Sequence, residues 1–213
     1  MAKKLTSLTS PISLLAEAQV VNLNKWTYPG MKIYGIQESI IEQLFRSGST
    51  VANTDKDEIN LKVTTLNLYY STFMQATKQM ADGIYDLKID DDLLSGNISL
   101  VEQIAKKTKR RNYSFATKYC ACHQPDKFPI YDEIVGKYLA HVAAKGNIPG
   151  YSGAWTTIQK NMKADYAIYK EIYDTFMQYY DLTTLSYREV DWYIWVAHKC
   201  ESILSGLKLF TLI

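Results

Sequence analysis

A basic segment precedes the residues of this chain that are best suited to chemistry. Between Glu102 and Asp126 the sequence has no acidic residue and six basic ones, namely Lys106, Lys107, Lys109, Arg110, Arg111 and Lys118. Such side chains contact the phosphates of nucleic acids, because each contact releases counterions. We therefore expect a nucleic-acid-binding segment made of Lys106, Lys107, Lys109, Arg110, Arg111 and Asn112. The alternative is a solvated helix end, since cations also stabilise a helix C-terminus.

Asp132 follows this basic segment and is the carboxylate whose position is best suited to chemistry. It comes after Pro129, Ile130 and Tyr131 and before an apolar helical pattern, which is typical of a helix N-cap. Backbone N–H groups and the helix dipole hold an N-cap carboxylate as an anion. Such an anion can stabilise the positive charge that develops as a glycosidic bond breaks, or orient an attacking water. The alternative is a purely structural cap worth about 1 kcal/mol.

Cysteine and histidine residues raise the question of a metal site. Cys120, Cys122 and His123 could in principle combine with His198 and Cys200. Residues two apart on a helix point to different sides, so neither pair converges easily on one ion. We expect no metal and no cofactor, and we interpret the cysteines as small buried hydrophobic residues. Nothing in the sequence brings a cysteine nucleophile and a histidine together.

Two stretches together carry a family resemblance. The first is Ser114-Phe115-Ala116-Thr117-Lys118-Tyr119-Cys120, and the second is Phe128-Pro129-Ile130-Tyr131-Asp132-Glu133-Ile134-Val135. The order of basic turn, short apolar helix, proline loop and Pro-Ile-x-Asp-x-x-Val resembles the core of the helix-hairpin-helix DNA glycosylase superfamily, over about residues 99–145. The resemblance implies double-stranded DNA as partner and Asp132 as catalytic carboxylate. The target base would be flipped from the stack, at a cost of roughly a few kcal/mol.

The chain departs from that family pattern at two places. The family hairpin contains glycine and binds phosphate through backbone N–H groups, whereas Lys106 to Asn112 has no glycine. Lyase-type members carry a catalytic lysine near the start of the apolar helix, where this chain has Ser114. Lys118 lies one helical turn later on the same face and is a displaced candidate amine for Schiff-base chemistry. The resemblance therefore favours simple base excision over combined excision and strand cleavage.

These observations lead to one functional hypothesis and two alternatives. We expect a glycosylase-like DNA-binding protein that excises a modified base in a pocket between two lobes, where tyrosine or tryptophan rings would stack on the base. A non-catalytic helical module that binds a nucleic acid or a protein would use the same basic segment. A third reading is an interaction protein that forms homo-oligomers through its apolar end, Leu204 to Ile213.

The composition is that of a globular protein, and its fold must position these residues. The 213 residues include 24 basic and 22 acidic ones, and the apolar share of 47% is near the globular average, which argues against a disordered or fibrous protein. The absence of a long apolar run and of a signal-peptide pattern predicts a cytoplasmic protein without a membrane anchor. We expect one helical domain over 1–213, with two lobes of about 1–95 and 96–213 and a loop at 146–153.

The elements themselves are predicted to be helical throughout. Only 10 Gly and 5 Pro leave little room for the turns of a β fold, so the predicted class is all-α, with about eight to ten helices. Tyrosines repeated over 166–180 at helical spacing predict a packed seam rather than a platform for stacking bases. Acidic residues 90–92 predict a turn, and Ser-x-x-Glu capping boxes are expected at Ser99 and Ser186. The predicted helical segments are 11–24, 36–44, 55–70, 73–84, 99–105, 113–123, 132–142, 166–180 and one from 186 onward.

Overall fold

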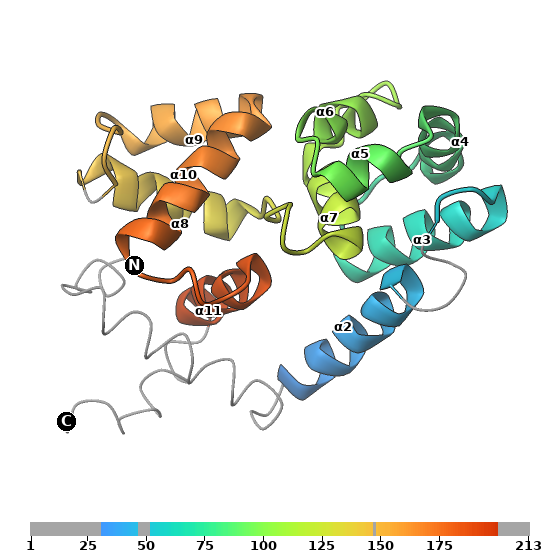
Figure 1. Cartoon of the computed structure of the whole chain (residues 1–213), viewed down its shortest axis with the longest axis horizontal. Coiled ribbons are helices and arrows are strands. Elements are labelled where there is room, and N and C mark those ends of the chain that lie inside the picture. The colour runs from blue at the N-terminus through green and yellow to red at the C-terminus, as the bar shows by residue number, and fades with distance from the viewer. Residues whose placement is uncertain (1–30, 47–51, 147, 200–213) are drawn as a thin grey trace.

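The computed structural model describes residues 31–46, 52–146 and 148–199 of the chain, and these residues form helices and loops without a strand (Figure 1). The predicted all-α class is therefore confirmed. The predicted helix over 11–24, the apolar end Leu204 to Ile213, and Cys200 lie outside the described residues. Among the described helices, none has the length and apolar character needed to cross a membrane.

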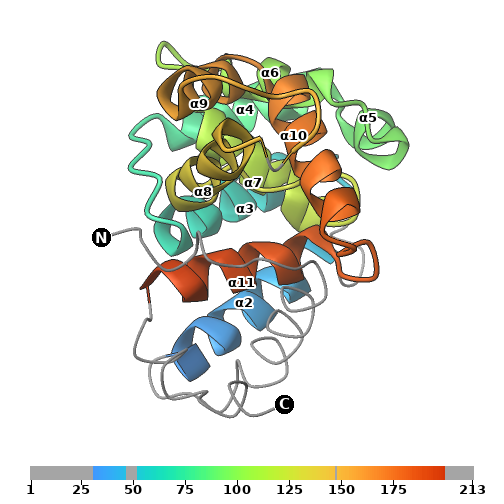
Figure 2. The same cartoon turned by 90° about the vertical axis from the view of Figure 1, so that its left-hand side faces the viewer.

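The helices form two groups that meet along one extended segment (Figure 1). One group contains α2 (Met31–Arg46), α3 (Lys56–Tyr69), α4 (Thr77–Leu87), α5 (Asp90–Ser95), α6 (Ser99–Ala105) and α7 (Tyr113–His123). The other contains α8 (Glu133–Ala144), α9 (Trp155–Ala164) and α10 (Tyr166–Tyr179). The last helix, α11 (Tyr187–Lys199), lies beside α2 (Figure 2). Residues 124–132, here called the linker, connect α7 to α8; the lobe boundary near residue 95 stays a prediction.

Three helix starts follow directly from side-chain chemistry. Asp55 Oδ1 accepts the N–H groups of the first turn of α3, and Asp132 Oδ1 accepts the Ile134 N–H at the start of α8. At α11 the predicted capping box is present, because the Glu189 carboxylate accepts both the backbone N–H and the hydroxyl of Ser186. These polar contacts satisfy N–H groups that have no partner within their helices.

The capping box predicted at Ser99 is wrong, although α6 does begin there. Asn97 Oδ1 accepts the Ser99 N–H and hydroxyl instead, at 3.1 and 2.8 Å. The Glu102 carboxylate pairs with Arg111 on the far side of the following loop. A guanidinium presents two charged donors to a carboxylate, which a single backbone N–H does not match.

The predicted helix over 73–84 and the turn at 90–92 both need correction. Helix α4 begins only at Thr77, because Ser71 and Phe73 have left-handed backbone angles, with φ of 47° and 54°, that break the helical path after α3. Residues 90–92 form the first turn of α5. Their acidic side chains are favourable at a helix N-terminus, and Asp90 also accepts the backbone and side-chain N–H groups of Asn53.

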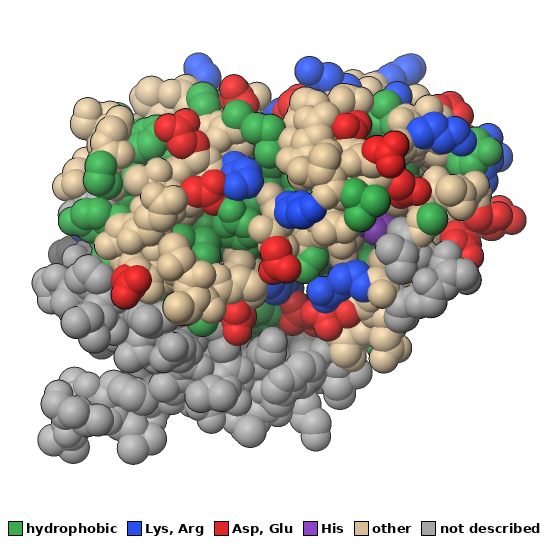
Figure 3. All heavy atoms as spheres, in the orientation of Figure 1, with side chains coloured by type: hydrophobic (Ala, Val, Ile, Leu, Met, Phe, Trp, Pro, Cys, Tyr) green, Lys and Arg blue, Asp and Glu red, His purple; other side chains and the backbone are tan. Residues whose placement is uncertain are grey.

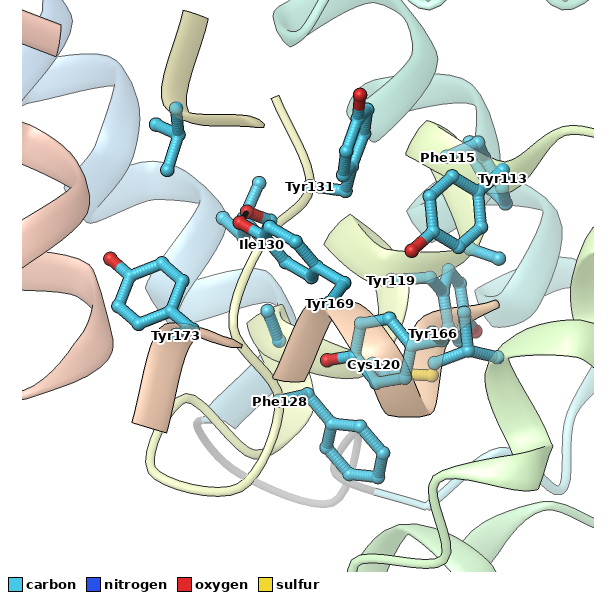
Figure 4. Close-up of a cluster of buried hydrophobic side chains, with 14 of the residues drawn as sticks. Tyr113, Phe115, Tyr119, Cys120, Phe128, Ile130, Tyr131, Tyr166, Tyr169 and Tyr173 are labelled. Carbon is cyan, nitrogen blue, oxygen red and sulfur yellow. Dashed lines mark hydrogen bonds between the residues drawn. The ribbon is translucent and has the colours of Figure 1, made fainter. Parts of the chain in front are cut away.

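The tyrosine seam of α10 packs as predicted and holds the linker in place. Tyr166, Tyr169 and Tyr173 are fully buried among residues of α7 and the linker (Figure 4). The Tyr166 hydroxyl donates to the Pro129 carbonyl at 2.9 Å, and that of Tyr169 donates to the Ile130 carbonyl at 2.5 Å. Because buried carbonyls need partners, these two hydroxyls stabilise an extended segment that no helix or sheet supports.

Candidate functional site

A cavity of about 200 Å³ lies where α3, α7, the linker and α11 meet. Aromatic rings make up much of its wall, and four charged side chains enter it. The lining residues are Tyr69, Tyr70, Ser71, Lys118, Ile130, Asp132, Arg188, Asp191, Trp192 and Trp195. The structure thus brings together Lys118 and Asp132, both candidate catalytic residues from the sequence, in one cavity.

Lys118 is a buried amine with few partners. Only 4% of the residue is exposed, and its Nζ donates to Ser114 Oγ at 2.6 Å and to the Tyr131 carbonyl at 3.2 Å. Burial lowers the pKa of Lys118, an effect that the nearby carboxylates of Asp132 and Asp191 oppose. The Lys118 amine therefore lies next to the side chain of Ser114, which is one helical turn earlier in α7.

Asp132 is the residue directly before α8 and also lines the cavity. Its Oδ1 accepts the Ile134 N–H at 2.7 Å, which is the predicted N-cap contact. The carboxylate is partly exposed, so capping does not bury it under a closed surface. The cap and the linker carbonyls bound by Tyr166 and Tyr169 fix its position from both sides.

A charged cluster on α11 completes the cavity. Arg188 donates through Nε to the Glu38 carboxylate of α2 and through Nη1 to Asp191 Oδ2, the latter at 2.5 Å. Trp192 Nε1 donates to the second oxygen of Glu38 at 2.7 Å. Burial raises the pKa of Asp191 to about 6, against the opposing effect of Arg188.

Sequence reasoning missed Glu38, Arg188, Asp191 and the two tryptophans. Arg188 and Asp191 are three residues apart, which places them on one helix face, but such spacing is common on exposed helices. Glu38 lies 150 residues before Arg188 in the chain. The tertiary fold alone brings these groups to the cavity.

Arg111, one of the predicted nucleic-acid contacts, is engaged within the protein. Its guanidinium pairs with Glu102 and donates to the carbonyls of Lys163 and Ala164 at the end of α9. The pair lowers the pKa of Glu102 against the effect of burial and raises that of Arg111. Arg111 therefore binds the basic loop, residues 106–112, to the group of helices that contains α9.

The other residues predicted to bind nucleic acid differ in how far their side chains already contact other groups of the protein. Lys106 pairs weakly with Glu102 at 3.4 Å, and Lys107 packs over Gly83, where an added Cβ would meet its side chain at 2.7 Å. Asn112 closes the loop, since its backbone N–H donates to the Ala105 carbonyl and its side chain to Thr108 and Arg110. Lys109 and Arg110 are exposed and form no ion pair with another described residue.

The surface around these residues carries mixed charge. On the face drawn in Figure 3, acidic and basic side chains are scattered among hydrophobic and other groups, and Lys and Arg side chains project at its upper edge. A nucleic acid would thus meet a local cluster of cations rather than a uniformly basic face.

Cys120 and His123 belong to the packed interior, and the partly buried Cys122 packs against it. Cys120 is fully buried, and burial raises the pKa of the Cys122 thiol to about 12. His123 packs its ring against Phe45 and Tyr119, and burial lowers its pKa to about 3. Within the described part of the chain, no cluster of three His, Cys, Asp or Glu residues could hold a metal ion. The side chain of His198 lies outside that part.

Fold and site together define an all-helical protein with a buried lysine and two carboxylates around an aromatic cavity. The chain belongs to the HI_0787_N family, whose N-terminal domain matches residues 17–127 and so includes Lys118. An uncharacterized protein of Haemophilus influenzae is 32% identical over 148 residues, which cover 67% of this chain and 65% of the relative. The chain thus matches just under two thirds of that relative's length. No solved structure matches significantly.

Proposed function

We propose that this chain is a glycosylase-like DNA-binding protein that excises a modified base, with Asp132 as its carboxylate. One observation carries the proposal: the Asp132 carboxylate and the Lys118 amine line the same cavity, between rings that a flipped base can stack on. The resemblance over residues 99–145 implies Asp132 independently of the cavity, whereas its lysine position falls on Ser114, one helical turn before Lys118.

The chemistry follows from the charges at the cavity. Water adds to C1′ of the sugar as the glycosidic bond breaks, and the electron pair of that bond leaves with the base nitrogen. The water loses a proton and the departing base gains one, so that an abasic sugar and a free base result. Positive charge develops on the sugar during this step, and the fixed anion of Asp132 stabilises it.

Lys118 supports a second route through a covalent intermediate. The lysine position of lyase-type enzymes is taken by Ser114 here, yet the Lys118 amine lies 2.6 Å from the Ser114 hydroxyl. Burial favours the neutral, nucleophilic amine. In this route Nζ forms the bond to C1′, the base leaves, and the sugar ring opens to an imine that water can later hydrolyse.

The basic loop supplies the proposed DNA contacts, at the N-terminal end of the helix that carries Lys118. It ends at Asn112, two residues before Ser114, whose hydroxyl contacts both Lys118 and the Tyr131 carbonyl. Lys109 and Arg110 are the exposed cations best suited to phosphates, while Arg111 and Asn112 shape the loop. Phosphates bound there would bring the duplex to the N-terminal end of α7, the helix that carries Lys118.

Base release is the direct test. Duplexes that carry oxidised, alkylated or deaminated bases are incubated with the protein, and free base and abasic sites are quantified. The expected result is release from at least one duplex, reduced about a hundredfold or more by Asp132→Asn. Asparagine caps helices as well as aspartate does, so the thermal unfolding of this variant should match the parent.

Two outcomes would redirect the proposal. Full activity in Asp132→Asn would remove this carboxylate from the mechanism. No release from the whole panel, combined with salt-dependent DNA binding, would favour the non-catalytic binding module instead. Borohydride trapping of a protein–DNA adduct, and its loss in Lys118→Met, tests the covalent route separately.

A further inference from the structure

Asp191 has one carboxylate oxygen that no other described residue contacts through a hydrogen bond. Its Oδ2 accepts Arg188 Nη1, whereas its Oδ1 has no hydrogen-bond partner among the described residues. Only 7% of the residue is exposed. An unsatisfied buried oxygen costs about 1–3 kcal/mol, and more when it is charged. Oδ1 has less than 1 Å² of accessible surface, so a donor on a ligand reaches it only when a neighbouring group in the cavity wall moves.

The surroundings of Asp191 indicate what kind of ligand could carry a donor to this oxygen. Asp191 and Trp192 are neighbours on α11, and the cavity that both line also presents Tyr69, Tyr70 and Trp195. Such rings favour a flat, unsaturated ligand lying against them. The cations of the cavity do not serve Oδ1: Lys118 donates to Ser114 and Tyr131, and Arg188 is held by Glu38 and Oδ2.

The size of the cavity limits the ligand further. Sites for drug-sized molecules are about 300–1,000 Å³. At about 200 Å³, this cavity suits a single heterocyclic base rather than a complete nucleotide. A second, smaller cavity of about 40 Å³ also borders Asp191, and it has room for little more than water.

We propose that Asp191 determines specificity by accepting a hydrogen bond from an N–H group on the edge of the base bound in the cavity. The substrate class is therefore bases that present an N–H donor, such as lactam-type purines and pyrimidines. This inference rests on the proposed function, because it takes the ligand to be an excised or flipped base.

The test compares ligands that differ in a single donor. Binding of 9-methylhypoxanthine against 1,9-dimethylhypoxanthine, and of 1-methyluracil against 1,3-dimethyluracil, is measured by isothermal titration calorimetry. In each pair a methyl group replaces the ring N–H, while the first methyl group stands in for the sugar. The parent protein should bind at least one N–H ligand about tenfold or more tightly than its methylated partner, as a hydrogen bond to a charged acceptor implies.

The Asp191→Asn variant separates hydrogen bonding from bulk. Arg188 continues to donate to the oxygen at the Oδ2 position, so the amide NH₂ replaces Oδ1 and offers a donor where an acceptor stood. The preference for the N–H ligand should fall below about threefold. The control is Asp174→Asn on α10, which lies outside the cavity lining and should keep the preference.

Each outcome has a distinct meaning. Equal affinity within both pairs, binding of none of the four ligands, or an unchanged preference in Asp191→Asn would overturn the role of Asp191. If Asp191→Asn fails to fold, equal affinity within both pairs on the parent protein still overturns the role of Asp191. Base release with no N–H preference would leave the proposed function intact, whereas an N–H preference without any base release would contradict excision and retain the base site.

Discussion

Two basic residues at α7, Arg111 just before the helix and Lys118 in its middle, use their charges in opposite ways. At its start, Arg111 has its guanidinium bound to Glu102 and to two backbone carbonyls, all from within the protein. About two turns further along, Lys118 lies in a cavity beside Asp132 and Asp191, and Asp191 keeps an oxygen without a partner in the described structure. A charged side chain whose hydrogen bonds are all made within the protein stabilises the fold. One that keeps an atom without a hydrogen-bond partner is a candidate for function.

The largest expected effect is the loss of activity in Lys118→Met. Base release, where it proceeds through the amine, should fall at least about a hundredfold. Stability should stay level or rise, because an apolar side chain of similar volume replaces a buried cation. Denaturant unfolding and base release are measured on the same preparation. A large loss of stability would instead make Lys118 a structural residue, like Arg111.

The second effect concerns Asp191 and pH. The pKa of Asp191 is about 6 in the folded protein, against about 3.9 for an unfolded aspartate. The protonated form is thus favoured by folding, so this contribution is present in full below pH 4 and is lost as pH rises to 6. Relative to Asp191→Asn, the parent should lose on the order of 2 kcal/mol of unfolding free energy over that range.

Urea unfolding of both proteins at several pH values measures this difference. The charged groups that act on Asp191 are Arg188, Asp132, Lys118 and Glu38. Parallel curves for parent and variant between pH 4 and 6 would show that Asp191 is ionised at its ordinary pKa.

A third, smaller effect is expected from Tyr169→Phe. Removal of the hydroxyl leaves the buried Ile130 carbonyl without this donor, which should cost about 1–3 kcal/mol of unfolding free energy. Tyr179→Phe, on the same helix but 47% exposed, is the matched control and should change stability by less than about 0.5 kcal/mol. A Tyr169 effect as small as that of Tyr179 would show that the linker does not depend on the seam.

The smallest effects distinguish two adjacent arginines. Arg111→Met should cost about 1 kcal/mol of stability, since its ion pair is partly exposed, and Arg110→Met should cost almost nothing. In DNA binding the order should reverse. Arg110→Met should reduce the slope of log affinity against log salt by about 0.9 for one lost phosphate contact. Identical salt slopes in parent and Arg110→Met would remove Arg110 from the interface.

The sequence predicted most helices because their signals are local. Asp55, Asp132 and Ser186 each cap a helix through contacts within three residues, and the tyrosine spacing of α10 marks its buried face. The capping box at Ser99 failed because its partner, Glu102, is drawn away by Arg111, nine residues further along. That competition between local and more distant partners has no signature in a short motif.

The candidate site was predictable in part for the same reason. Lys118 and Asp132 stand in a continuous stretch with a recognisable order of turn, helix and proline loop. Their convergence on one cavity depends on the path of the linker, which the hydroxyls of α10 stabilise. Glu38 and Arg188 meet across most of the chain, so no pattern of spacing could have paired them.

The bonds around the linker also limit how the cavity can change shape. Tyr166 and Tyr169 hold its carbonyls on one side, and on the other Thr117 accepts the Tyr131 N–H while Lys118 donates to the Tyr131 carbonyl. The linker is thereby locked to α7 and α10 at once and cannot serve as a hinge. The cavity opens to solvent beside the partly exposed Asp132, so a ligand can enter without movement of the linker. A change in the shape of the cavity would thus arise at the turn after α3, where the exposed Ser71 has a left-handed backbone, while the linker wall stays fixed.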